Sequence, residues 1–90
     1  MSAKKSANIK GKYSQKDVAL RIRALRRSSG FTQQALADKL GISNRQLSYI
    51  ESGERSLSVP NAEILVHLYS VSLDYIYFGS DANENADPIH

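Results

Sequence analysis

The sequence has 90 residues, a formal net charge of +3 and 41% hydrophobic residues, which suits one small globular domain with a single core. It contains no cysteine, which excludes disulfides and thiolate metal sites, and its two histidines, His67 and His90, lie far apart with no ligand cluster around either. It has no run of 18 apolar residues and no apolar secretory core after the basic N-terminus, so we expect a cytoplasmic protein.

The charges are divided unevenly along the chain. Residues 1–45 hold 11 of the 12 Lys and Arg residues and two acids, whereas residues 46–90 hold one arginine, Arg55, and seven acids. A basic half presented on one side of a domain is the expected footprint of a phosphate-binding surface. The alternative is that the charges only keep a small protein soluble.

The first 28 residues predict an N-terminal arm followed by a helix. Residues 1–13 are polar and basic without a hydrophobic period, which indicates a disordered arm that either lies along a nucleic acid or is merely solvated. Ser14 to Asp17 has the form of a capping box, with Asp in place of Glu, and starts a helix that runs to about Ser29. We expect this helix to be a scaffold whose buried face carries Val18, Ile22, Leu25 and Arg26. Leu20, Arg23 and Arg27 point elsewhere.

Two short helices follow, and they are separated by a three-residue turn. Thr32 is a good N-cap for a helix over Gln33–Leu40, and Gly41 stands where a residue at positive φ is needed to end it. Ser43 can cap a second helix from Asn44 to Ser52, with Gly53 as its stop. The apolar residues of this stretch can be buried only where the two helices cross, so the pattern predicts a helix-turn-helix. These residues are Leu36, Leu40, Ile42, Leu47 and Ile50. The exposed face of the second helix carries Asn44, Arg45, Ser48 and Tyr49.

Two more helices complete the predicted domain. Ser58 can cap the first, with Pro60 in its opening turn, and Ser72 can cap the second, over Leu73–Phe78. The first has a core stripe of Ala62, Leu65, Val66 and Tyr69 and a second apolar stripe of Ile64 and Leu68. In the second, Leu73 and Ile76 should point inward, which leaves Tyr75, Tyr77 and Phe78 at or near the surface. Residues 80–90 are acidic and polar and predict a disordered tail.

These residues resemble the helix-turn-helix of Cro/cI-type, or XRE-like, transcriptional regulators. The resemblance extends from about Ile22 to Gly79 and implies an all-α, five-helix, lambda-repressor-like DNA-binding domain with a helix-turn-helix, here over residues 14–79. The matching positions are Thr32-Gln33, Leu36-Ala37, Leu40-Gly41-Ile42-Ser43, Leu47, Ile50-Glu51 and Gly53.

An α-helix fits the major groove of B-DNA, where Asn can bond adenine and Arg can bond guanine through two hydrogen bonds. We therefore expect Asn44, Arg45, Ser48 and Tyr49 to contact bases, although Asn44 could instead be a second cap beside Ser43. The resemblance implies that Gln33 contacts a phosphate, rather than only starting its helix, and that Arg26 and Glu51 form a partly buried ion pair rather than two solvated charges. We expect further phosphate contacts from Ser43, Arg55, Ser56 and Asn61.

One such module buries little DNA surface, so we expect a homodimer on a near-palindromic operator. The candidates for its interface are Ile64, Leu68, Tyr75, Tyr77 and Phe78; some of them could instead complete the core of a monomer. The expected function is sequence-specific binding of double-stranded DNA by a transcriptional regulator that acts as a repressor. The alternative is a protein-interaction module, such as an antitoxin, with DNA binding secondary. We expect neither an enzyme nor a cofactor or metal, because no spacing in the sequence pairs a nucleophile with a base.

Overall fold

The computed structural model describes residues 13–79, and this part of the chain is all-α, as the sequence predicts. The predicted arm up to residue 12 and the predicted tail lie outside the described residues. Within residues 13–79 there are five helices: α2 (Gln15–Ser28), α3 (Gln33–Leu40), α4 (Asn44–Glu51), α5 (Val59–Tyr69) and α6 (Leu73–Phe78). None of them has the length and hydrophobicity that a helix needs to cross a membrane.

Each of these helices begins at a serine or threonine in extended conformation. The side-chain oxygen accepts a hydrogen bond from the backbone N–H three residues later, which satisfies one of the free donors of the first turn. The five N-caps are Ser14, Thr32, Ser43, Ser58 and Ser72. The reciprocal capping box lies at α4, where the Gln46 side chain accepts from the backbone N–H of Ser43 at 2.9 Å. The sequence pattern predicts a capping box at Ser14, where only the bond to the Ser14 side chain forms, and it does not predict the box at Ser43.

The turn between α3 and α4 depends on Gly41. Its φ of 72° lies in the left-handed region, and its N–H donates to the carbonyl of Asp38 while that of Ile42 donates to the carbonyl of Ala37. These bonds end α3 within one residue and turn the chain steeply. The helix-turn-helix therefore forms where the pattern predicts it, and α4 ends at Glu51, one residue earlier than expected.

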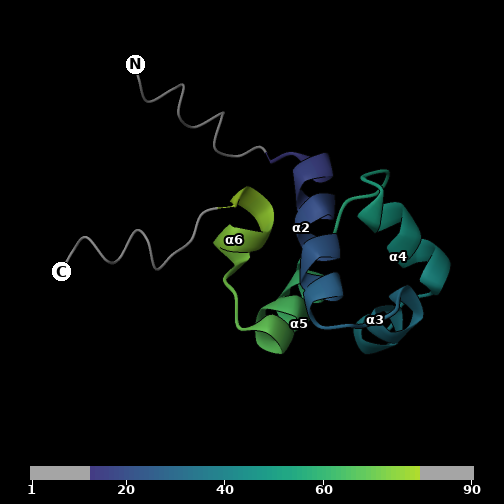
Figure 1. Cartoon of the computed structure of the whole chain (residues 1–90). Helices are drawn as coiled ribbons and strands as arrows, with labels where there is room; N and C mark the ends of the chain where they lie inside the picture. Colours follow the sequence, from purple (N-terminus) through teal and green to yellow (C-terminus); the bar gives the residue numbers. More distant parts are fainter. Residues whose placement is uncertain (1–12, 80–90) are drawn as a thin grey trace, which may run out of the picture.

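The core lies where the helix-turn-helix packs against α2 and α5, and α6 packs against these two helices on the side away from α3 and α4 (Figure 1). In this arrangement α2 contacts α4 and α6, α3 contacts α4 and α5, and α5 contacts α6. Ile22, Leu36, Leu47, Leu65 and Ile76 are fully buried at the centre. The α2 helix packs against α4 and so fixes the direction in which α4 projects.

Four apolar residues differ from the expectation. Leu25, expected on the buried face of α2, is only half-buried and lies outside the core. Leu73, expected to point inward, is 38% exposed, because a helix of six residues has fewer than two turns and Ile76 occupies its place in the core. Ala19 and Leu57 are buried, although sequence analysis assigned neither to the core. Leu57 belongs to the α4–α5 loop, where no helical period could indicate its orientation.

Aromatic side chains join the start of the described chain to α6. Tyr77, expected near the surface, is half-buried; its hydroxyl donates to the carbonyl of Leu57 at 2.9 Å, and burial raises its pKa, with the nearby Tyr13 adding to the effect. The ring of Tyr13 lies 4.9 Å from that of Tyr77 and 6.5 Å from that of Phe78. Tyr13, the last residue of the predicted arm, thus packs against the domain.

Candidate nucleic-acid interface

The α4 helix has one buried face and one polar face. Leu47, Ile50 and Glu51 are buried, while Asn44, Arg45 and Ser48 are exposed. The capping bonds of α4 come from Ser43 and Gln46, which leaves the side chain of Asn44 outside the cap. A polar edge at the start of an exposed helix offers donors and acceptors in the arrangement that base contacts in a major groove require.

Tyr49 is half-buried and lies between two arginines. Both Nε and Nη2 of Arg45 lie 3.3 Å from the Tyr49 hydroxyl, and both donate to it. The guanidinium of Arg45 is 5.8 Å from the centre of the Tyr49 ring, and that of Arg55, from the loop after α4, is 5.1 Å from it. These cation–π contacts gather two positive charges around one aromatic ring on the polar edge of α4.

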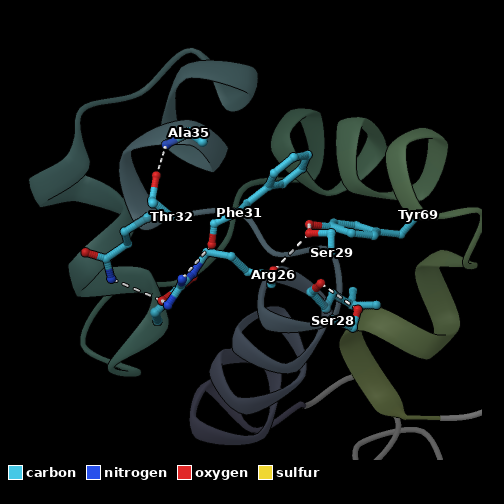
Figure 2. A network of polar contacts seen from close by, with 10 residues as sticks. Arg26, Ser28, Ser29, Phe31, Thr32, Ala35 and Tyr69 are labelled. Atoms are coloured by element: carbon cyan, nitrogen blue, oxygen red, sulfur yellow. Dashed lines mark hydrogen bonds and ion pairs between the residues drawn. The ribbon is translucent and has the colours of Figure 1, made fainter.

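Arg26 and Glu51 form an ion pair at the junction of α2, α3 and α4. Figure 2 shows Arg26 next to Phe31 and Thr32, just before α3 begins. Arg26 Nε donates to Glu51 Oε2 at 2.7 Å, Nη2 to Oε1 at 3.0 Å and Nη1 to the carbonyl of Phe31 at 3.0 Å. Gln33 Nε2 donates to Glu51 Oε1 at 3.1 Å, so the side chain expected to contact a phosphate is bonded within the domain. The network fixes the start of α3 against the end of α4.

Two hollows flank α4. The α5-side hollow, of about 210 Å³, is lined by Ile42, Gln46, Ile50, Arg55, Ser56, Ser58 and Asn61. The α2-side hollow, of about 260 Å³, is lined by Arg23, Arg26, Arg27, Gln33, Ser48, Glu51 and Ser52. The α4 helix therefore has a depression along each side.

The structure groups most of the predicted phosphate-contacting residues. Arg55 and Ser56, from the loop after α4, meet Asn61 of α5 in the α5-side hollow, and Gln33 lines the other. Ser43 is outside both lining sets, and its N–H and hydroxyl both donate to Gln46, which leaves Ser43 occupied as the helix cap.

Sequence reasoning missed Arg23, Arg27 and Ser52 as parts of this surface. The spacing of four residues between the two arginines puts them on one face of a helix, which is a signal in the sequence. Nothing in the sequence indicated that this face borders α4.

Among residues 13–79, no group of three or more His, Cys, Asp or Glu side chains could hold a metal ion.

The chain is similar to known regulators in sequence and in fold. A family model described as "Helix-turn-helix" matches residues 22–76. The HTH-type transcriptional regulator PrpR of Mycobacterium tuberculosis is 35% identical over 75 residues, which is 83% of this chain and 15% of PrpR. ImmR of Bacillus subtilis, also an HTH-type transcriptional regulator, is 38% identical over 56 residues, 62% of this chain and 44% of ImmR. The chain thus spans less than half the length of either relative.

The similarity extends to a solved structure. The restriction-modification controller protein C.AhdI of Aeromonas hydrophila superposes with a TM-score of 0.63 at 23% identity, over 71% of this chain and 93% of that one. At this identity the likeness concerns the fold, and it confirms the predicted five-helix, lambda-repressor-like architecture.

The fold and the polar edge of α4 together define a DNA-binding helix-turn-helix protein. The chain belongs to the helix-turn-helix family of XRE, or Cro/cI-type, transcriptional regulators, as the sequence motif predicts. This family consists of regulators of transcription and not of enzymes.

Proposed function

We propose that the protein binds a specific, near-palindromic DNA operator as a homodimer and represses transcription from a promoter there. The observation that carries the proposal is the polar edge of α4, exposed between the two hollows. A helix placed in the major groove meets bases along its exposed edge and a phosphate backbone on each side. The names of PrpR and ImmR as transcriptional regulators support the same role.

Arg45 is the strongest candidate for choosing a base. It is exposed on the first turn of α4, and its guanidinium is held against Tyr49 before any DNA is bound. Less conformational entropy is lost when a side chain that is already ordered makes its contact. We assign Arg45 to guanine and Asn44 to adenine, with Ser48 and Tyr49 as further contacts on the next turn.

The phosphate contacts of the proposal come from both sides of α4. Arg55, Ser56 and Asn61 would hold the backbone along the α5-side hollow. Gln33 would bind a phosphate beside the start of α3, where free backbone N–H groups favour an anion. To do so, its side-chain amide would release Glu51 and donate to a phosphate oxygen instead. These contacts orient α4 without selecting a sequence.

The dimer interface in this proposal is the apolar surface of α5 and α6. Ile64 and Leu68 are 37% and 36% exposed one turn apart on α5, and Phe78 is 48% exposed at the end of α6. Tyr75, on the same helix as Phe78, is half-buried, whereas Tyr77 is already bonded to the α4–α5 loop and is the weakest of the candidates. Exposed large apolar side chains that form a patch are typical of protein interfaces.

The dimer is tested by sedimentation of the purified protein at several concentrations. We expect the double variant Ile64→Gln/Leu68→Gln to sediment as a monomer, and Leu20→Gln, which changes a 59% exposed leucine on α2, to behave as the unaltered chain. A wild-type protein that stays monomeric both free and on its operator would exclude the homodimer.

The same apolar surface is what favours a second function, in which a different protein covers it and DNA binding is secondary. The two functions differ in what covers Ile64 and Leu68: a second copy of the chain in the first, and a different protein in the second. Partner binding predicts that the double variant abolishes the partner complex but keeps the affinity for a half-site, and that no symmetric operator exists.

Selection of bound duplexes from a random DNA pool tests the main proposal directly. We expect an enriched motif with two-fold symmetry, its half-sites centred about 10 base pairs apart. Equal recovery of all sequences would contradict sequence-specific binding, and an enriched motif without symmetry would contradict the dimer. Placing the motif over a promoter in a reporter then shows whether the protein represses or activates.

A further inference from the structure

We propose that α2 is itself part of the DNA-binding surface, and that Arg23 and Arg27 bind the phosphate backbone of double-stranded DNA at the α2-side hollow. The inference extends the proposed function, on which it rests, from the helix-turn-helix to the helix that precedes it. The sequence predicted that α2 would serve as a scaffold and that these two arginines would point away from its buried face, without a role in DNA binding.

The first support is the charge of the α2-side hollow. Three arginines line it, Arg23, Arg26 and Arg27, against one carboxylate, Glu51. Glu51 is 3% exposed and is bonded through both oxygens to Arg26, so its charge is satisfied by that residue. Among residues 13–79 this is the one ion pair, and no carboxylate of that part of the chain neutralises Arg23 or Arg27. The hollow therefore has an excess of two positive charges and suits an anion.

The second support is the position of the hollow next to α4. Ser48 belongs both to the polar edge of α4 and to the lining of the α2-side hollow, and Ser52 continues the same lining one turn later. When the edge of α4 lies in the major groove, the backbone that borders the groove on this side must pass the hollow. Gln33, at the first position of α3, lines the same hollow and would contact the same strand.

The third support is the rigidity of the hollow. The Arg26–Glu51 pair lines this hollow, and its two hydrogen bonds fix α2 against α4. Arg23 is half-buried and Arg27 is exposed, one helical turn apart, so the two guanidinium groups project from one face of a fixed helix. Guanidinium groups suit phosphate because they donate two parallel hydrogen bonds to its oxygens.

The test compares two double variants of the full chain that each remove two positive charges. Arg23→Gln/Arg27→Gln alters the α2-side hollow, whereas Arg21→Gln/Lys39→Gln alters α2 and α3 at residues that line neither hollow. Each variant is titrated with the duplex that the wild-type protein selects and with a random duplex, over a salt range from about 50 to about 300 mM KCl. Thermal melting by circular dichroism confirms that both variants are folded at the temperature of the titration.

For Arg23→Gln/Arg27→Gln we expect roughly tenfold weaker binding of both duplexes near 0.1 M salt, and a salt slope of log K that is shallower by about 2. The preferred sequence should not change, because phosphate contacts do not identify bases. We expect the control variant to keep the slope within about 0.5 of the wild-type value.

The inference is overturned if log K depends on salt with the same slope in the two double variants. This result is expected if Arg23 and Arg27 face solvent and do not contact DNA. The inference is also overturned if Arg23→Gln/Arg27→Gln changes the selected motif and leaves the slope unaltered. Failure of the proposed function looks different: the wild-type protein then selects no sequence, whether or not the salt slope depends on Arg23 and Arg27.

Discussion

Arg26 and Glu51 are joined by two parallel hydrogen bonds, 2.7 Å and 3.0 Å long, across the interface between α2 and the end of α4. Glu51 is 3% exposed and Arg26 is 15% exposed, so both charges are largely withdrawn from water. The pair lies beside the polar edge of α4 that is proposed to contact bases, without belonging to it, which makes its effect on stability separable from an effect on DNA contacts.

Removing one partner of this pair should destabilise the domain more than removing both. Glu51→Leu leaves the Arg26 charge in a mostly buried position, and we expect it to lower the free energy of unfolding by about 3 kcal/mol, the lower end of the range for fully buried pairs. Arg26→Met/Glu51→Leu should recover a large part of that loss, because no charge is then stranded. Urea unfolding of the two single variants and the double variant measures the coupling; additive losses would show that the two charges act independently.

Arg45 and Arg55 should differ in what they contribute to DNA binding. Arg45→Ala should relax the preference at one position of each half-site by about 1–3 kcal/mol, since the arginine is proposed to contact a base. Arg55→Ala should weaken binding to all sequences to a similar extent and reduce the salt slope by about 1, since it is proposed to contact a phosphate. Repeating the selection and the salt titration with each variant distinguishes the two roles, and a uniform loss for Arg45→Ala would remove its assignment to a base.

The hydroxyl of Tyr49 should matter through Arg45. Tyr49→Phe keeps the ring that lies near Arg45 and Arg55 but removes the oxygen to which Arg45 Nε and Nη2 donate at 3.3 Å. We expect operator affinity to fall by about 0.5–1.5 kcal/mol, as for the loss of one hydrogen bond, with little change in the melting temperature. Fluorescence anisotropy of a labelled operator measures this. The proposed base contact of Tyr49 is made by its ring, which Tyr49→Phe keeps, so in an Arg45→Ala background the same substitution should have no further effect. An undiminished effect there would mean that the hydroxyl contacts the DNA directly.

Two glycines of positive φ provide a matched test of backbone and packing strain. Gly30 has a φ of 77° and open space where a Cβ would lie, whereas a Cβ at Gly53, φ 84°, would lie 3.1 Å from Lys16 Cγ and 3.3 Å from Lys16 Cα. Gly30→Ala should cost about 1–2 kcal/mol for the left-handed conformation alone. Gly53→Ala should cost more, because α2 must also move away from the end of α4. Thermal unfolding of both variants checks the order, and equal losses would show that the contact with Lys16 is relieved without cost.

Stability should decline at alkaline pH partly through Tyr77. Burial raises the pKa of this hydroxyl above its usual value of 10.0, so the unfolded chain releases the proton at a lower pH than the folded domain does. The stabilisation is therefore complete below about pH 10 and is lost as the pH rises through the folded-state pKa. Comparing the melting temperature of the wild type and Tyr77→Phe from about pH 7 to about pH 11 isolates this contribution from other titrating groups.

Tyr77→Phe should be the less stable protein at neutral pH, since it lacks the bond to the Leu57 carbonyl, by about 0.5–1.5 kcal/mol. The difference in stability between the two proteins should narrow above about pH 10, because the Tyr77 hydroxyl of the unfolded wild-type chain ionises there. A constant difference across the whole range would show that Tyr77 does not contribute to the alkaline loss.

The local features of this protein were determined by its sequence alone. Caps at Thr32 and Ser43, the stop at Gly41 and the apolar stripes of the central helices depend on residues within one or two turns of each other, so the pattern predicted the helix-turn-helix and the exposed edge at Arg45. Even Arg26 and Glu51, 25 residues apart, were paired in advance because the motif resembles a known family.

The tertiary structure decided which surfaces meet. The side of α2 that carries Arg23 and Arg27 borders Ser48 because of the angle at which α2 and α4 pack, and this angle depends on core contacts between distant residues. For the same reason Leu57 is buried from a loop, Leu73 is left at the surface, and the Tyr77 hydroxyl finds its partner 20 residues away. Helical periodicity gives the direction of a side chain about its own axis; the neighbour it meets there is set by how the helices pack together.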